Sequence, residues 1–202
     1  MPRLHKFKPV RLPTITKLRL KDLPGGQQYA SEIETGNDQR YGMSLGYKEA
    51  ADLLASRIAR EPWRHARLAA PMLFLYRHYL ELHLKSLLAD AGQLLDAPQA
   101  IPQQHYLRQL WSDVRALLLR ISPESDGEWF TRADQVIGDF DRLDQGSFSC
   151  RYPVDLKGRR SLPHGFRVDA RVPRRMIAEL HILLDGASTQ IDEFMGYKHE
   201  TP

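Results

Sequence analysis

The chain has 202 residues, of which 42% are hydrophobic and 27% are charged, so it can bury one sizeable core. Its single cysteine, Cys150, excludes an internal disulfide and a cysteine-based metal cluster, and it favours a reducing compartment. No run of roughly 18 apolar residues occurs, and the basic start lacks the apolar core of a signal peptide. We therefore expect a cytoplasmic protein that does not enter a membrane.

Positive charge is concentrated in two stretches of the chain. The formal net charge is +4, residues 1–21 contain seven Lys or Arg and no acid, and a second basic block covers 157–175. Such clusters neutralise phosphates in nucleic-acid complexes, although runs of charge are as often plain solvated surface. The charge pattern thus fits a nucleic-acid partner and a plain solvated surface equally well.

The first half of the chain predicts an arm and two helices. Prolines and glycines interrupt residues 1–45, which we expect to form a basic extended arm, and one helical domain follows over 46–202. Apolar residues at helical spacing predict a first helix over about 47–58 and a second over about 71–92. Pro62 marks the end of the first helix.

The second half predicts three more helices. Apolar stripes indicate a third helix over about 107–121 and a fourth over about 129–140. Alternating apolar and polar residues then predict a small β-hairpin at about 147–170, before a final helix over about 173–194. The expected fold class is therefore mainly α, a bundle of four to five helices with a small β-hairpin inserted before the last helix.

Residues 71–88, PMLFLYRHYLELHLKSLL, read as a helix that is apolar almost all round but carries five ionisable side chains: Arg77, His78, Glu81, His83 and Lys85. At about 100° per residue, Arg77, Glu81 and Lys85 share one face, whereas His83 projects about 120° away from Arg77. Buried charges must be paired or used, so the cluster is either an ion-pair ladder that pins the helix or a site. The sequence leaves both interpretations open.

The segments RHYLELHLK at 77–85, HYLRQLW at 105–111 and SCRYPVD at 149–155 together resemble bacterial proteins of the HEPN superfamily. The resemblance covers residues 68–155. It implies an all-helical HEPN-like domain, often a homodimer, and frequently a metal-independent ribonuclease of toxin–antitoxin or antiphage systems. A partner antitoxin or defence protein is part of that expectation.

The signature of the superfamily is an Arg followed four to six residues later by a His, commonly with a polar residue directly after the Arg. On the second helix, Arg77-His78-x4-His83 has all three elements. The two outer side chains of this match diverge on one helix, however.

A second match lies on the last helix, where Arg174-x6-His181, or equally Arg175-x5-His181, has Met176 in place of the polar neighbour. Arg174 and His181 are two turns apart on nearly the same face. A dimer could also join an Arg of one chain to a His of the other.

Metal-free RNA cleavage needs a base for the 2′-hydroxyl proton, a cation for the phosphorane and an acid for the leaving oxygen, roles that His and Arg can fill. The candidate catalytic residues are Arg77, His78, Glu81, His83, Arg174 and His181. The candidate RNA-binding residues are Lys85, Arg151, Lys157, Arg159, Arg160, Arg171 and Arg175. No metal or other cofactor is expected. The alternative function is a catalytically inactive module of the same fold that binds RNA, a nucleotide or a protein partner.

Overall fold

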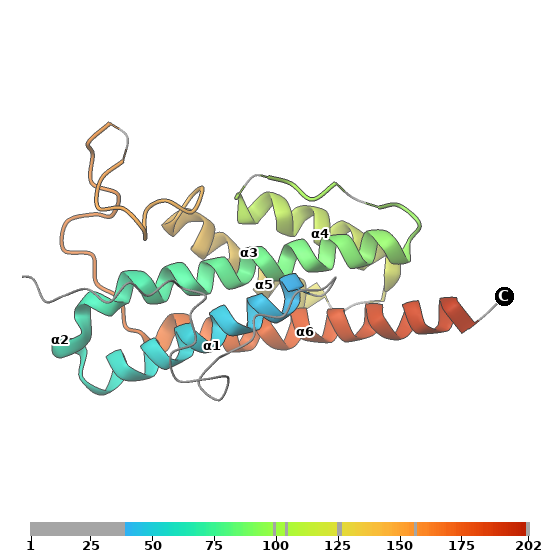
Figure 1. Ribbon diagram of the computed structural model, residues 1–202, viewed down its shortest axis with the longest axis horizontal. Coiled ribbons are helices and arrows are strands. Elements are labelled where there is room, and N and C mark those ends of the chain that lie inside the picture. The colour runs from blue at the N-terminus through green and yellow to red at the C-terminus, as the bar shows by residue number, and fades with distance from the viewer. Residues whose placement is uncertain (1–38, 99, 104, 125–126, 156, 201–202) are drawn as a thin grey trace, which may run out of the picture. The chain divides into compact units, whose positions relative to one another are not determined.

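The computed structural model describes residues 39–98, 100–103, 105–124, 127–155 and 157–200. The helices within them are α1 (Gln39–Arg60), α2 (Pro62–His65), the 3₁₀ turn η2 (Ala66–Leu68), α3 (Ala69–Leu94), α4 (Leu107–Ile121), α5 (Gly127–Leu143) and α6 (Arg171–Glu200), shown in Figure 1. The mainly α fold is confirmed. None of the described helices is long and apolar enough to cross a membrane.

The predicted β-hairpin at 147–170 is not seen. In the described part of that segment, a single isolated bridge joins Val154 to Arg160. The alternating residues before it fold into a turn instead, because the amides of Arg151 and Tyr152 both donate to the Phe148 carbonyl at 3.1 Å. This turn brings the rings of Phe148 and Tyr152 to 4.7 Å, a contact that a strand would not allow.

The helix predictions are confirmed at different levels of accuracy. The third helix has the expected bounds, and the last one runs through Gly186 without a break. The first helix begins at Gln39, so residues 39–45 of the expected arm are helical, and residues 1–38 lie outside the described residues. Pro62 ends α1 as expected, but it also opens α2, where a proline at the first helical position loses no hydrogen bond.

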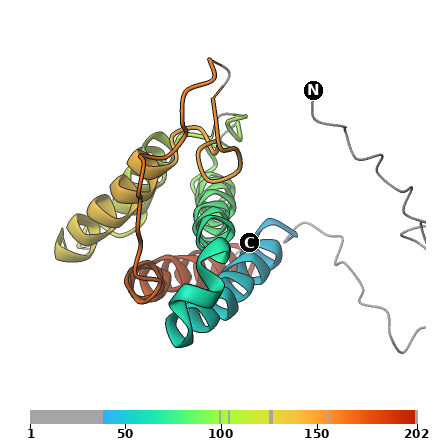
Figure 2. The same ribbon diagram turned by 90° about the vertical axis from the view of Figure 1, so that its left-hand side faces the viewer.

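Helix α3 is the centre of the packing. It contacts α1, α4 and α6, and Figure 2 shows it between the α1–α6 pair and the α4–α5 pair. Fourteen of its side chains are buried, which explains why its sequence is apolar almost all round. Arg77, Glu81 and His83 are buried against these neighbours, whereas His78 and Lys85 are partly exposed.

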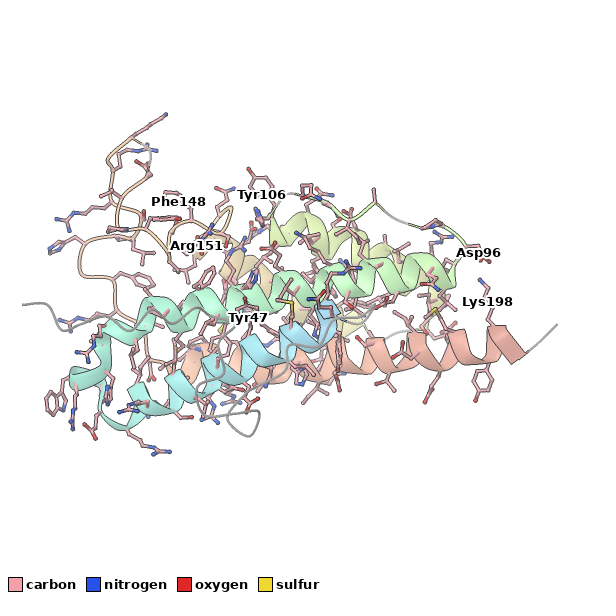
Figure 3. The ribbon with its side chains drawn as sticks, viewed as in Figure 1. Tyr47, Asp96, Tyr106, Phe148, Arg151 and Lys198 are labelled. Atoms are coloured by element: carbon pink, nitrogen blue, oxygen red, sulfur yellow. The ribbon has the colours of Figure 1, made fainter. Side chains whose placement is uncertain are left out.

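The far end of α6 is tied to the end of α3. Lys198 Nζ lies 2.6 Å from Asp96 Oδ1 and donates to the Leu94 carbonyl at 3.0 Å (Figure 3). A cation on the last carbonyl of a helix complements the negative end of its dipole. This contact holds together the ends of α3 and α6.

Candidate functional site

The charged stripe of α3 is a buried ion-pair ladder. Arg77 Nη1 lies 3.1 Å from Glu81 Oε2, and Lys85 Nζ lies 2.9 Å from Glu81 Oε1. The exposed fraction is 0% for Arg77 and 2% for Glu81. Of the two interpretations of this stripe, the structure supports the ladder, because neither side chain faces solvent where RNA could reach it.

Arg77 also fixes two loops. Its Nε donates to the Asp144 carbonyl at 2.8 Å, and its Nη2 donates to the His105 carbonyl. The guanidinium thereby joins α3 to the entrance of α4 and to the end of α5. Asp144 in turn accepts a hydrogen bond from the Ser149 amide, so the ladder sets the course of the segment that begins at residue 144.

Glu81 remains a carboxylate inside this ladder. Burial alone would raise the pKa of Glu81, but hydrogen bonds from Lys85 and His105 outweigh burial and hold the pKa below its usual value. His105 Nδ1 lies 2.6 Å from Glu81 Oε1. Because all its partners are structural, Glu81 is not available as a catalytic acid.

His78 is a packing residue. Its ring meets Tyr47 edge-on at 4.5 Å between centroids and stacks on Phe74 at 5.7 Å. Burial lowers the pKa of His78, which favours the uncharged ring at neutral pH.

His83 is completely buried on the other side of α3. Its Nε2 lies 3.2 Å from Ser188 Oγ, and the Tyr41 and Tyr79 rings meet it edge-on. Burial, followed by the nearby His181, lowers the pKa of His83 to about 4. The Arg77 and His83 side chains thus diverge, and neither reaches solvent.

The burial of His83 makes stability depend on pH. The pKa falls from 6.5 in the unfolded chain to about 4 in the fold, so stability from the neutral ring is complete above pH 6.5 and is lost between pH 6.5 and pH 4. We expect this group to remove about 3 kcal/mol over that window. Urea unfolding of wild type and His83→Gln from pH 7 to pH 4 measures the difference, and equal slopes for both proteins would contradict it.

Arg174 and His181 both lie on a polar seam between α1 and α6, two turns and about 10 Å apart along the axis of α6. We define the α1–α6 seam by Tyr41, Lys48 and Asp52 on α1 and by Arg174, His181 and Asp185 on α6. Asp52 connects the two helices, because its carboxylate lies 3.0 Å from Lys48 Nζ and 3.7 Å from Arg174 Nε. The Tyr76 hydroxyl of α3 also donates to the Asp52 carboxylate, at 2.7 Å. A second link between α1 and α6 is the hydrogen bond that the Tyr41 hydroxyl donates to the Asp185 carboxylate.

Solvent reaches the centre of this seam. The Arg174 side chain is 52% exposed, and His181 is half-buried. The Tyr79 hydroxyl lies 3.1 Å from His181 Nδ1, while Nε2 has no hydrogen-bond partner among the described residues. When Nδ1–H donates to the Tyr79 oxygen, the lone pair is on Nε2, where it can accept a proton.

Burial and the Lys48 ammonium lower the pKa of His181, against the opposing effect of Asp185 and Asp52. At neutral pH the ring is therefore uncharged and able to act as a base. Lys48→Gln should raise the pKa of His181, and Asp52→Asn should lower it further. NMR titration of the His181 ring measures both shifts, with Lys198→Gln as the control. Shifts of the same sign in the two seam variants would contradict this electrostatic picture.

Sequence reasoning missed four residues of the seam, Tyr41, Lys48, Asp52 and Asp185, as well as Tyr79 of α3, whose hydroxyl lies beside His181. Lys48 and Asp52 are four residues apart and form an ion pair on α1, a spacing that the sequence contains but that does not indicate which helix they face. Arg175, the alternative partner of His181, points away and pairs with Glu179 at 2.9 Å while 84% exposed. The structure therefore brings Arg174, rather than Arg175, into the seam.

The candidate RNA-binding residues divide into two groups. Those already paired with a carboxylate are Lys85 with Glu81, Arg159 with Asp155, Arg171 with Asp169, and Arg175 with Glu179. Within the described residues, Arg151, Lys157 and Arg160 have no such pairing. Arg151 packs its guanidinium 5.6 Å from the centres of both the Phe74 and Tyr152 rings, and Figure 3 shows it beside Phe148 above α3.

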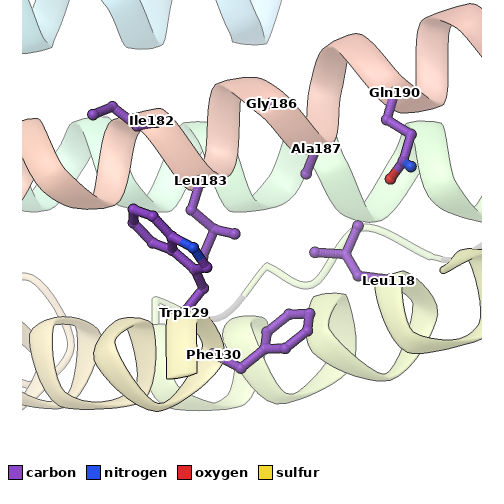
Figure 4. A pocket seen from close by; sticks show the side chains of 8 residues that line it. All are labelled: Leu118, Trp129, Phe130, Ile182, Leu183, Gly186, Ala187 and Gln190. Atoms are coloured by element: carbon purple, nitrogen blue, oxygen red, sulfur yellow. The ribbon is translucent and has the colours of Figure 1, made fainter. Parts of the chain in front are cut away.

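A cavity of about 300 Å³ lies between α6 and the α4–α5 pair (Figure 4). Trp129 and Leu183 face each other across it, and Gly186 leaves open space on the α6 side. Gln190 is its most polar lining residue. This cavity contains no group for proton transfer or phosphate binding.

No three His, Cys, Asp or Glu side chains in the described part of the chain are grouped to hold a metal ion. Among the described residues, the α1–α6 seam contains an exposed cation, Arg174, a second cation, Lys48, and an uncharged histidine, His181. Comparison of the chain with protein-family models, curated proteins and solved structures finds no match.

Proposed function

We propose that this protein is a metal-independent endoribonuclease that cleaves RNA at the α1–α6 seam. One observation carries the proposal: Arg174 and His181 lie on one accessible side of α6, the Tyr79 hydroxyl lies 3.1 Å from Nδ1 of the histidine, and Nε2 has no partner among the described residues. The lowered pKa of His181 supplies a base at neutral pH.

Four seam residues have a role in this reaction. His181 Nε2 takes the proton of the ribose 2′-hydroxyl, whose oxygen attacks the adjacent phosphorus. Arg174 and Lys48 stabilise the charge of the phosphorane, and the bond to the 5′-oxygen then breaks. The products are a 2′,3′-cyclic phosphate and a 5′-hydroxyl. Asp52 positions both cations, since it contacts Lys48 and Arg174.

A homodimer completes the proton transfers. The leaving 5′-oxygen needs a proton, and one seam offers one histidine with an open ring nitrogen. In our proposal, His181 of a second copy supplies that proton from the minor fraction in which its ring is protonated, which agrees with the dimeric state implied by the HEPN resemblance. The same resemblance implies a toxin–antitoxin or antiphage setting, with an antitoxin or defence partner.

Arg174→Gln tests the proposal, with Arg175→Gln as its matched control. We expect Arg174→Gln to lower the rate of cleavage of single-stranded RNA in EDTA by about 10²–10³-fold, the usual effect of removing one charge-stabilising donor. Arg175→Gln removes the same charge one residue away and should leave the rate nearly unchanged, because its side chain points out of the seam. Equal rates for both variants would reject the seam as the site.

The second candidate function is RNA binding without cleavage. The 3.7 Å contact between Asp52 and Arg174 favours it. The negative carboxylate beside the guanidinium weakens the electrostatic attraction of Arg174 for phosphate, and with it the stabilisation of the phosphorane that cleavage needs. Binding that falls steeply with salt, together with no cleavage by wild type, would identify this function.

A further inference from the structure

Two adjoining cavities lie where the segment after α5 passes the beginning of α3, as the orange trace in Figure 1 shows. One, of about 640 Å³, is lined by residues 149–154 and by Arg160. The other, of about 870 Å³, is lined by α2, η2 and residues between 162 and 168. Ala70 and Leu162 line both cavities, so the two lie next to each other. We call the two cavities together the basic–aromatic groove.

Four arginines line this groove, and no carboxylate does: Arg67, Arg151, Arg160 and Arg167. Within the described residues, none of the four pairs with an acid. The neighbouring acids are already occupied, because Asp155 pairs with Arg159 at 2.8 Å and Asp169 pairs with Arg171 at 2.6 Å. The groove therefore carries positive charge that no described carboxylate offsets, which favours an anionic occupant.

Three aromatic rings accompany these arginines. The exposed fraction is 83% for Trp63, 49% for Tyr152 and 42% for Phe166. Exposed aromatic rings that gather beside cations are typical of an interaction surface. The Tyr152 ring is held in place, since it packs on Phe148 at 4.7 Å and beneath the Arg151 guanidinium.

The segment that forms one wall of the groove is anchored in the core. Asp144 receives the Arg77 guanidinium on its carbonyl and the Ser149 amide on its side chain. Farther along, the Asp155 carboxylate accepts the amides of Lys157 at 2.8 Å and Arg159 at 2.9 Å, which closes a tight turn. The part of the groove wall between Asp144 and Asp155 is thus held in place at both of its ends before any ligand binds.

We propose that the basic–aromatic groove binds a single strand of RNA, with bases stacked on Trp63, Tyr152 and Phe166 and phosphates on the four arginines. Alternating aromatic platforms and cations are what single-strand binding requires. An acidic peptide would use the arginines but would leave the rings without a function. A paired duplex would present no free base faces to the rings.

The groove also approaches the α1–α6 seam. A further hollow lined by Ile58, Pro62, Arg167 and Arg171 shares three of these residues with the groove and reaches the first turn of α6. Arg174 lies one turn beyond Arg171. The groove would therefore lead one RNA strand toward the seam where we propose cleavage. That its ligand is the substrate RNA rests on the proposed function.

The test is fluorescence anisotropy of a labelled 2′-O-methyl RNA of about 12 nucleotides, a length within the usual site size of single-strand binders. Trp63→Leu and Tyr152→Leu should each raise Kd by about 5- to 150-fold, the loss of one stacked base. Arg160→Gln with Arg167→Gln should reduce the slope of log K against log salt by about 1.4, for two lost phosphate contacts.

Arg120→Gln with Arg142→Gln is the matched control, because it removes the same charge from exposed positions on α4 and α5. Equal weakening by the control pair and the groove pair would overturn the proposal, and so would tighter binding of an acidic peptide than of RNA. The 2′-O-methyl strand has no nucleophilic hydroxyl, so its binding is independent of cleavage. If RNA binding depends on the groove but the wild-type protein cleaves no RNA, the proposed ribonuclease activity is rejected and the proposed RNA-binding groove stands.

Discussion

His181→Ala lowers the rate of RNA cleavage by about 10²–10⁴-fold, the range for loss of a positioned general base. The physical reason is that Nε2 of this ring, the proton acceptor in our proposal, has no partner among the described residues, while the lowered pKa keeps the ring uncharged. Cleavage rates in EDTA, measured at saturating RNA, give the effect on the chemical step. The melting temperature should change little, because the ring is only half-buried.

The control for this variant is His105→Ala, a histidine that is bound to Glu81 and lies outside the seam. We expect it to retain cleavage. Tyr79→Phe gives a finer test, since it removes the hydroxyl beside Nδ1 but keeps the buried ring. Cleavage at the wild-type rate in His181→Ala would exclude this histidine as the base.

Arg77→Met lowers the free energy of unfolding by about 3–5 kcal/mol, the cost of removing one partner from a buried ion pair. The substitution leaves Glu81 and Asp144 buried without their guanidinium, and two loop carbonyls lose a donor. Chemical denaturation at pH 7 measures the change. Because Arg77 sets the course of the segment after residue 144, RNA binding in the basic–aromatic groove should weaken as well.

Arg142→Gln provides the comparison for a surface ion pair. Its partner Asp139 lies four-tenths exposed, and such pairs contribute at most about 1 kcal/mol. Arg77→Met combined with Glu81→Gln should recover part of the lost stability, since the second change removes the unpaired charge. A loss of under about 1 kcal/mol in Arg77→Met would contradict the ladder interpretation.

The helices that could be predicted from the sequence are those with a clear apolar stripe. Helix α4 was located to the residue because Leu110, Val114 and Leu117 repeat at helical spacing and are all buried. The beginning of α1 was missed because Gly42 and Gly46 weaken its local pattern, and a distant contact holds it: Tyr41 donates to Asp185 on α6. Spacing along one segment contains no information about such a contact.

The prediction of a β-hairpin failed for a related reason. Phe148, Cys150 and Tyr152 alternate with polar residues, but Cys150 is anchored in the core and the two rings pack on each other across a turn. Alternation indicates a strand only when a neighbouring strand can pair with it, and one bridge is all that forms in the described residues.

The candidate site was predictable in part. The shared face of Arg174 and His181 follows from helical geometry alone, as does the divergence of Arg77 and His83. Which pair reaches solvent was not predictable, because it depends on the packing that buries Arg77 and His83 and leaves Arg174 and His181 accessible. The contributions of Asp52 and Tyr79 depend on the packing of three helices that are distant in sequence.

Analysis of the 5′ and 3′ ends of the RNA products tests most directly whether the seam cleaves RNA without a metal ion. Wild-type protein and His181→Ala are incubated with single-stranded RNA in EDTA, and the new ends are identified by mass spectrometry. We predict 2′,3′-cyclic phosphate and 5′-hydroxyl ends with wild type, strongly reduced with His181→Ala. No new ends with wild type, or the same yield from both proteins, would contradict the account.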